Sequence, residues 1–230
     1  KVMTTLTEPE SGSVTVDGVN VIKNPAEARK HIGLAGQYAA VDEFLTGRET
    51  LIMIGRLYGM SAKLSKERAG ELLDKLGLTE ASDRQTKTYS GGMRRRLDLG
   101  ASLVATPKVL FLDEPTTGLD PRTRIQLWNI IRDLVSQGVT ILLTTQYLDE
   151  ADALCDYIYV IDKGKMIVEG TSEELKQSLG QDVIELKVKN EELQKTQKIL
   201  ESAMGREVLV DELTRRIRLK TLSGAEDLLT

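Results

Sequence analysis

Two largely apolar runs, with a helical pattern between them, constrain the fold of this chain more than any other feature. The runs are Val109–Leu112 and Val139–Thr144, and segment 121–137 between them has the pattern of a helix. Strands that are apolar at nearly every position suit a parallel sheet covered on both faces, because a sheet with one wet face alternates apolar and polar residues. The pattern therefore predicts a right-handed β-α-β unit within a parallel α/β sheet.

Two carboxylates stand immediately after the first apolar run, at Asp113 and Glu114. The carboxyl ends of strands in open α/β sheets border the crevice in which ligands bind, and adjacent carboxylates repel each other unless a cation or water receives them. Mg²⁺ on a nucleotide phosphate is such a cation. We expect Asp113 to hold it and Glu114 to act on the water that attacks the γ-phosphate. The competing interpretation is a surface Asp-Glu pair, which the apolar run before it and Pro115 after it disfavour.

A serine and two glycines, Ser90, Gly91 and Gly92, precede another helical pattern. Ser90 is predicted to cap that helix, and the glycines allow backbone N–H groups to approach a phosphate closely. A helix N-terminus favours anions, although a Ser-Gly-Gly tripeptide by itself is a common loop. The basic run 94–96 that follows is predicted to be a set of solvated helix-face or interdomain charges.

Taken in chain order, three motifs resemble those of the ABC-type ATPase family. Tyr89–Met93 is similar to its signature motif, Val109–Glu114 to its Walker B strand and Thr117–Asp120 to its D-loop. The resemblance implies an α/β fold, namely an ABC-type P-loop NTPase core with a helical signature subdomain. It also implies that ATP and Mg²⁺ are the cofactors and that the intact protein hydrolyses ATP.

In that family the signature motif closes over the γ-phosphate bound to the other subunit of a head-to-tail pair. The resemblance therefore makes Ser90, Gly91 and Gly92 nucleotide-binding residues, and it assigns Asp120 to the same site. Met93 departs from the usual Gln and cannot offer an amide hydrogen bond. Contacts from the backbone of the two glycines would survive this difference.

Two glutamines complete the resemblance. Gln37 follows an expected strand and looks like the glutamine of the Q-loop, which reaches the Mg²⁺ and water site and whose loop touches the membrane partner. Gln146 stands where most relatives carry His, and because an amide cannot carry a proton as imidazole can, Glu114 must supply the base function alone. Gln146 with segment 147–152 resembles the daunorubicin-resistance type of ATP-binding subunit.

The phosphate loop of such ATPases, GxxxxGK followed by Ser or Thr, does not occur among these 230 residues. Thr5–Gly12 matches the segment that follows the loop in relatives, so Lys1 falls beyond the loop's lysine and is expected to be a helix-surface charge. Without the loop's N–H groups and lysine, the phosphates lose most of their positive surroundings. We expect these 230 residues alone to bind ATP weakly and to hydrolyse little of it.

Composition limits the other ligands. A formal charge of −4 and a pI near 5.3 give no basic stripe for nucleic acid, so DNA or RNA is not expected as a main ligand. Cys155 and His31 are the only residues of their types, which excludes an internal disulfide and a metal cluster between them and fits a reducing cytoplasm. No run approaches the roughly 18 apolar residues of a membrane span, so a membrane would be served through a partner.

The domain prediction rests on a change in the sequence pattern along the chain. We expect an ABC ATPase domain over 1–175, with a helical subdomain at about 45–105, and a small β-α-β accessory domain over 180–230. Thr46 and Ser65 are predicted to cap two helices of the subdomain, which end near 60 and 76. Further strands are expected at Ser13–Gly18, Ile32–Gly36, Tyr157–Ile161, Met166–Glu169, Asp182–Val188, Val208–Val210 and Arg215–Leu219, and further helices from 171 and over Glu191–Met204.

The resemblance implies an ATP-binding and hydrolysing subunit that powers a membrane exporter of drugs or other small hydrophobic compounds. It would lie peripherally on the cytoplasmic face of the membrane, with an integral membrane permease and a second ATPase domain, or a second copy, as partners. One alternative is an ABC-type ATPase of DNA repair or translation, whose long insertion or duplicated cassette does not fit in 230 residues. Another is a nonhydrolytic nucleotide-sensing module, which Met93 and Gln146 favour and Glu114 disfavours.

Overall fold

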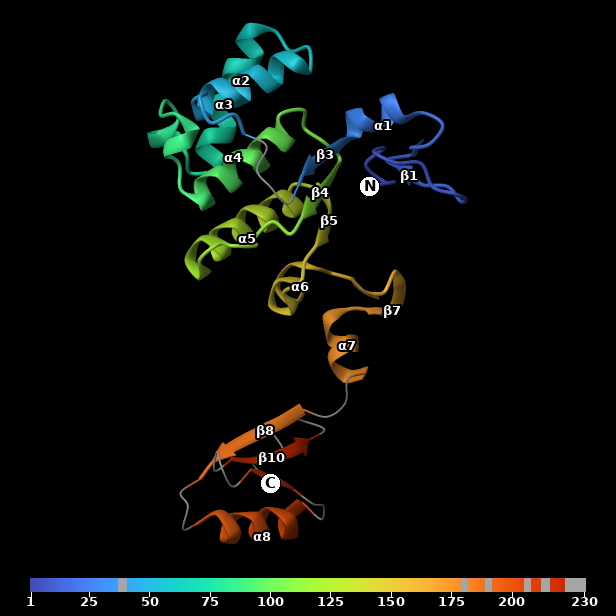
Figure 1. The fold of residues 1–230 in the computed structure, drawn as a ribbon, viewed down its shortest axis with the longest axis vertical. Coiled ribbons are helices and arrows are strands. Elements are labelled where there is room, and N and C mark those ends of the chain that lie inside the picture. Colours follow the sequence, from blue (N-terminus) through green and yellow to red (C-terminus); the bar gives the residue numbers. More distant parts are fainter. Residues whose placement is uncertain (37–40, 179–181, 189–191, 205–207, 212–215, 222–230) are drawn as a thin grey trace. The chain divides into compact units, whose positions relative to one another are not determined.

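The computed structural model describes residues 1–36, 41–178, 182–188, 192–204, 208–211 and 216–221 (Figure 1). The chain forms two compact units, Lys1–Cys155 and Asp156–Thr230. We predicted domains of 1–175 and 180–230, and the units divide earlier in the chain. Assignment of the C-terminal residues to an accessory domain stays a prediction.

A three-stranded parallel sheet lies at the centre of the first unit. Its strands are β3 (Ile32–Ala35), β4 (Val109–Asp113) and β5 (Thr140–Thr144), in the order β3-β4-β5. Strand β4 is paired along both edges, and its residues Leu110 and Leu112 pack into the main core and are buried as predicted. The prediction that both faces of β5 are covered is wrong, because none of its residues is fully buried and Leu142 remains 38% exposed.

The crossover between β4 and β5 is helix α5 (Pro121–Ser136), as the pattern predicted. Pro121 occupies its first turn, where a missing N–H costs nothing, and the Asp120 side chain accepts a hydrogen bond from the Thr123 N–H. Its buried residues are Leu127, Ile131 and Leu134, which recur at helical spacing on one face. This face packs into the main core.

Three further helices lie within the range of about 45–105 predicted for a helical subdomain: α2 (Gly47–Leu57), α3 (Ala62–Lys75) and α4 (Gly91–Leu103) (Figure 1). Thr46 caps α2 through a reciprocal capping box with Glu49, as predicted.

The predicted cap of α3 is wrong. The helix begins four residues earlier than expected, and its cap is Ser61, whose hydroxyl accepts from the Leu64 N–H. Ser65 lies buried inside the helix and donates to the Ser61 carbonyl. A serine within a helix can satisfy its hydroxyl in this way, so the residue type alone did not identify the helix start. Two short 3₁₀ helices, η1 (Thr79–Ala81) and η2 (Thr86–Thr88), connect α3 to α4.

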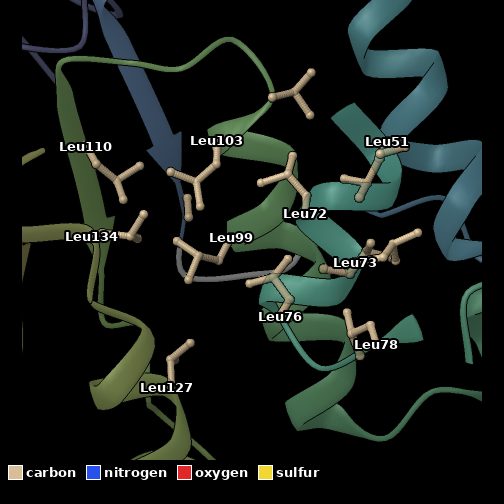
Figure 2. Close-up of a cluster of buried hydrophobic side chains, with 14 of the residues drawn as sticks. Leu51, Leu72, Leu73, Leu76, Leu78, Leu99, Leu103, Leu110, Leu127 and Leu134 are labelled. Atoms are coloured by element: carbon tan, nitrogen blue, oxygen red, sulfur yellow. The ribbon is translucent and has the colours of Figure 1, made fainter. Parts of the chain in front are cut away.

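Leucines from α2, α3, α4, α5, β4 and the α3–η1 loop meet in one core (Figure 2). The labelled members are Leu51, Leu72, Leu73, Leu76, Leu78, Leu99, Leu103, Leu110, Leu127 and Leu134. Gly33 lets α4 approach β3 closely, since a Cβ there would lie 2.6 Å from the Ser102 carbonyl oxygen. The core therefore joins the helical subdomain to the sheet that carries the two carboxylates.

The N-terminal part of the first unit is a small hairpin and a helix. Strand β1 (Thr15–Val16) lies within the predicted strand Ser13–Gly18 and pairs antiparallel with β2 (Val19–Asn20), which was not predicted. The chain turns between them at Asp17 and Gly18, both with positive φ. Helix α1 (Pro25–His31) follows and was not predicted, although Pro25 in its first turn is a start signal. Helix α6 (Leu148–Leu154) ends this unit after β5.

The second unit begins with an antiparallel hairpin of β6 (Ile158–Asp162) and β7 (Lys165–Gly170), followed by α7 (Ser172–Ser178). A three-stranded antiparallel sheet then has the order β8-β10-β9, with α8 between β8 and β9 in sequence. The bounds are β8 (Asp182–Lys187), α8 (Leu193–Met204), β9 (Leu209–Asp211) and β10 (Arg216–Thr221). These elements match the expected strand-helix-strand pattern, while residues 223–230 lie outside the described residues.

Candidate functional site

The predicted metal ligand Asp113 and the predicted catalytic residue Glu114 lie at the carboxyl end of β4, the central strand of the sheet. Asp113 is exposed and pairs in register with Thr144, the last residue of β5. The Thr144 hydroxyl donates a short hydrogen bond to Asp113 Oδ1. A solvent-facing carboxylate with a hydroxyl beside it is a suitable partner for a hydrated divalent cation.

Glu114 has an unusual backbone conformation. Its φ is +45°, in the left-handed region that non-glycine residues rarely adopt. Its N–H donates to the Thr144 carbonyl at 3.0 Å, and its Oε2 accepts from the Thr117 hydroxyl at 3.0 Å. Strained backbone of this kind persists where the surrounding structure fixes it, and it gathers at functional sites.

The glycine motif is the N-terminus of α4, as predicted. Ser90 caps the helix by accepting from the Met93 N–H at 3.3 Å. A Cβ on Gly91 would meet nothing within 4 Å, so this glycine leaves the helix end open to a ligand. A Cβ on Gly92 would lie 2.3 Å from Thr123 Cγ2, so Gly92 serves the close packing of α4 against the start of α5.

For the other predicted site residues, Asp120, Gln146 and Gln37, the structure gives no contact that tests the predicted role. Asp120 caps α5 through the N–H and hydroxyl of Thr123, at 3.0 and 2.6 Å, and these hydrogen bonds lower the pKa of the Asp120 carboxyl. Gln146 is exposed in the segment between β5 and α6. Gln37 lies outside the described residues. Roles for Asp120, Gln146 and Gln37 at a nucleotide stay predictions.

The prediction for the basic run of α4 is wrong for Arg95. Its side chain is 9% exposed, and it donates to the backbone carbonyls of Asp113 at 2.9 Å and Pro115 at 2.8 Å. Arg94 is the more exposed neighbour and pairs with Glu43 at 3.1 Å. Three consecutive arginines carry no sequence signal for which one is buried, because that depends on how α4 is rotated against the strand ends.

Glu150 on α6 was not predicted as a site residue. It is completely buried, and its Oε1 accepts from the Thr116 hydroxyl at 2.8 Å and from the Trp128 indole at 2.9 Å. It thereby connects α6 to α5 and to the segment that follows Glu114. An acidic residue that stands between other acidic residues, Asp149 and Asp152, gives no hint of burial.

A further cavity lies away from the two carboxylates. A cavity of about 440 Å³ is lined by residues of α3 and by those preceding β4 and β5, among them Lys108 and Gly138. It therefore lies at the amino ends of these strands, away from Asp113 and Glu114. Within the described ranges, no group of three or more His, Cys, Asp and Glu residues is arranged to hold a metal ion.

Comparisons with known proteins agree with the motifs. A family model described as ABC transporter matches residues 1–117. The chain is 57% identical over 188 residues to the daunorubicin/doxorubicin resistance ATP-binding protein DrrA of Streptomyces peucetius, covering 82% of this chain and 57% of the relative. It is 49% identical over 218 residues to the daunorubicin resistance ATP-binding protein DrrA2 of Streptomyces coeruleorubidus, covering 94% of this chain and 68% of the relative. A linearmycin resistance ATP-binding protein of Bacillus subtilis is 40% identical over 175 residues, which cover 76% of this chain and 56% of the relative.

Solved structures agree on the fold. The structure of cbiO1 from Clostridium perfringens, part of an ABC transporter complex, is similar with a TM-score of 0.70 at 25% identity, over 77% of this chain and 72% of that one. An ADP- and phosphate-bound dimeric ATP-binding cassette, MJ0796, has a TM-score of 0.66 at 22% identity, over 74% of this chain and 78% of that one. The α/β fold is thus confirmed, and the chain spans under three fifths of the first relative. From the family model and these relatives, we conclude that the chain belongs to the ABC transporter family.

Proposed function

We propose that this chain is the greater part of an ATP-binding and hydrolysing subunit that powers an ABC exporter of drugs or other small hydrophobic compounds. The observation that carries the proposal is the exposed Asp113 and strained Glu114 at the carboxyl end of the central strand. Names of the similar relatives, which refer to daunorubicin, doxorubicin and linearmycin resistance, support the choice of cargo class.

In this proposal the two carboxylates have different roles. Asp113 and the adjacent Thr144 hydroxyl would hold Mg²⁺, which uses few protein carboxylates and takes its remaining ligands from phosphates and water. When bound, Mg²⁺ would neutralise charge on the β- and γ-phosphates. Glu114 would accept a proton from the attacking water, and Gln146 would orient that water by hydrogen bonding.

A second copy, or a paired ATPase domain, would complete the nucleotide site. The N-terminus of α4 has the positive end of a helix dipole, and its Gly91 leaves the backbone open. We propose that Ser90, Gly91 and Gly92 meet a γ-phosphate held by that partner, with Asp120 and Gln37 at the same interface. Gly92 would contribute mainly by positioning α4 against Thr123.

An integral membrane permease is the further proposed partner. None of the helices in the part of the chain that the structure describes is both long and apolar enough to cross a bilayer. Phe44, in the segment that follows Gln37 and precedes α2, is 73% exposed. We propose that this segment docks on the permease at the cytoplasmic face of the membrane.

Transport by the reconstituted complex tests the proposal. The subunit is prepared at the full length of its relatives, combined with its permease in inside-out vesicles and given ATP, and daunorubicin accumulation is measured together with phosphate release. We expect phosphate release to require ATP and Mg²⁺, and daunorubicin accumulation to require the permease as well. Phosphate release without daunorubicin movement would reject the drug cargo, and the absence of phosphate release would reject the enzymatic assignment.

A further inference from the structure

We propose that Arg95 is a positioning residue for Glu114, because it fixes the backbone on both sides of that carboxylate. The inference rests on the proposed ATP hydrolysis and adds to it a residue outside the reacting groups. Arg95 lies on α4, whereas Glu114 follows β4, so two separate elements meet at this point.

The contacts of the Arg95 guanidinium enclose the Glu114 backbone. Its Nη2 donates to the Asp113 carbonyl at 2.9 Å and its Nε to the Pro115 carbonyl at 2.8 Å. Its Nη1 donates to the carbonyl of Gly36, the residue after β3, and lies 3.4 Å from Asp98 Oδ2. One planar group thus joins the carbonyls before and after Glu114 to the neighbouring strand end.

Glu114 needs such support. Its φ of +45° is unfavourable for a residue with a side chain, and the conformation survives only when its neighbours determine it. Thr144 supplies one constraint by accepting the Glu114 N–H at 3.0 Å. Arg95 supplies the constraints on the two flanking carbonyls, so the direction of the Glu114 side chain depends on it.

Glu150 of α6, a second buried charged residue, contacts the segment that follows Glu114. Glu150 Oε1 accepts from the Thr116 hydroxyl, and its Oε2 has no hydrogen-bond partner among the described residues. Asp98, Asp113 and Glu150 all interact electrostatically with Arg95, offsetting part of the desolvation that lowers the pKa of its guanidinium. The buried cation is therefore compensated by acidic groups at the site itself, rather than paired at the protein surface.

The forked shape of arginine is what this position uses. A guanidinium directs several N–H groups in fixed directions, whereas a lysine ammonium is a point charge on a flexible stem. Arg95→Lys keeps the charge but should not reach the Asp113 and Pro115 carbonyls together. Arg94→Lys is the matched control, because Arg94 lies next to it on α4 with a more exposed side chain.

The test is a double-mutant cycle in the full-length subunit. We expect Arg95→Lys to lower kcat for ATP hydrolysis between about 10- and 100-fold, with KM for ATP within about threefold, because a small misplacement of a reacting group has an effect of this size. In a Glu114→Gln background the same change should lower kcat no further, since the group that it positions is already gone. Arg94→Lys should behave as the parent protein in both backgrounds.

A measurement without nucleotide separates positioning from activity. Hydrogen exchange of peptide 113–117 should be about 10-fold faster in Arg95→Lys than in Arg94→Lys, while exchange in α2 and α3 stays unchanged. The proposal is overturned if Arg95→Lys keeps the parental kcat, lowers kcat equally in the Glu114→Gln background, or leaves exchange at 113–117 unaltered. A parent protein that hydrolyses no ATP would overturn the proposed function, whereas parental hydrolysis that is insensitive to Arg95→Lys would overturn only this inference.

Discussion

Replacing Glu114 by Gln in the full-length subunit lowers kcat for ATP hydrolysis by about 10²- to 10⁴-fold, which is the usual contribution of a positioned general base. Glutamine has nearly the same shape and can still accept from the Thr117 hydroxyl, which donates to Glu114 Oε2 at 3.0 Å. It cannot accept a proton from water. The affinity for ATP should stay within a few-fold of the parent protein, so the loss should appear in phosphate release and not in nucleotide binding.

The matched control is Glu67→Gln on α3. Glu67 is an exposed residue with a weak contact to Lys63 at 3.9 Å, and its replacement removes the same charge from the protein surface. We expect it to leave kcat unchanged. Hydrolysis by Glu114→Gln at the parental rate would show that another group activates the water.

The second large effect concerns the strand that carries the carboxylates. Leu110→Ala should lower the free energy of unfolding of the first unit by about 2–5 kcal/mol, because Leu110 is 0% exposed and its removal leaves a cavity in the core. Trp128, the only tryptophan of the chain, lies on α5 within this unit. Its fluorescence during urea unfolding therefore reports the unit that contains the mutation.

Leu57→Ala on α2 makes the same chemical change at an exposed position. Leu57 is 78% exposed, so we expect its replacement to change the free energy of unfolding by no more than about 0.5 kcal/mol. If Leu110→Ala and Leu57→Ala lowered the free energy of unfolding by similar amounts, the assignment of β4 to the centre of the core would be contradicted. The slope of the unfolding free energy against urea concentration should be the same in both variants. Equal slopes show that the two variants differ in stability and not in the surface that unfolding exposes.

Much of the first unit could be predicted because its sequence patterns are local. The apolar run of β4 and the helical spacing of Leu127, Ile131 and Leu134 are read directly from neighbouring residues. The start of α3 could not be chosen this way, because Ser61 and Ser65 are both credible caps and only the packed structure buries Ser65. The exposure of β5 depends on what packs on its two faces, which its own sequence does not state.

The residues of the candidate site also fall into those that the local sequence predicts and those that it does not. Asp113, Glu114 and the Ser90 cap follow from residue type and position within one element. The burial of Arg95 and Glu150 depends on contacts between α4, β4, α5 and α6, which are distant in sequence. Tertiary contacts of this kind leave no periodic signal in a single sequence, so the residues that support the site were missed while those that end its strand were found.

The most direct test of the central claim is whether the acidic end of β4 receives the metal of a bound nucleotide. Binding of Mn²⁺ in the presence of a nonhydrolysable ATP analogue is measured by electron paramagnetic resonance on the full-length subunit, for the parent, Asp113→Asn and the exposed α5 control Asp133→Asn. We expect Asp113→Asn to weaken Mn²⁺ binding about 10-fold or more, because it removes a metal-binding carboxylate, and Asp133→Asn to have no effect. Parental Mn²⁺ affinity in Asp113→Asn would show that Asp113 does not hold the metal.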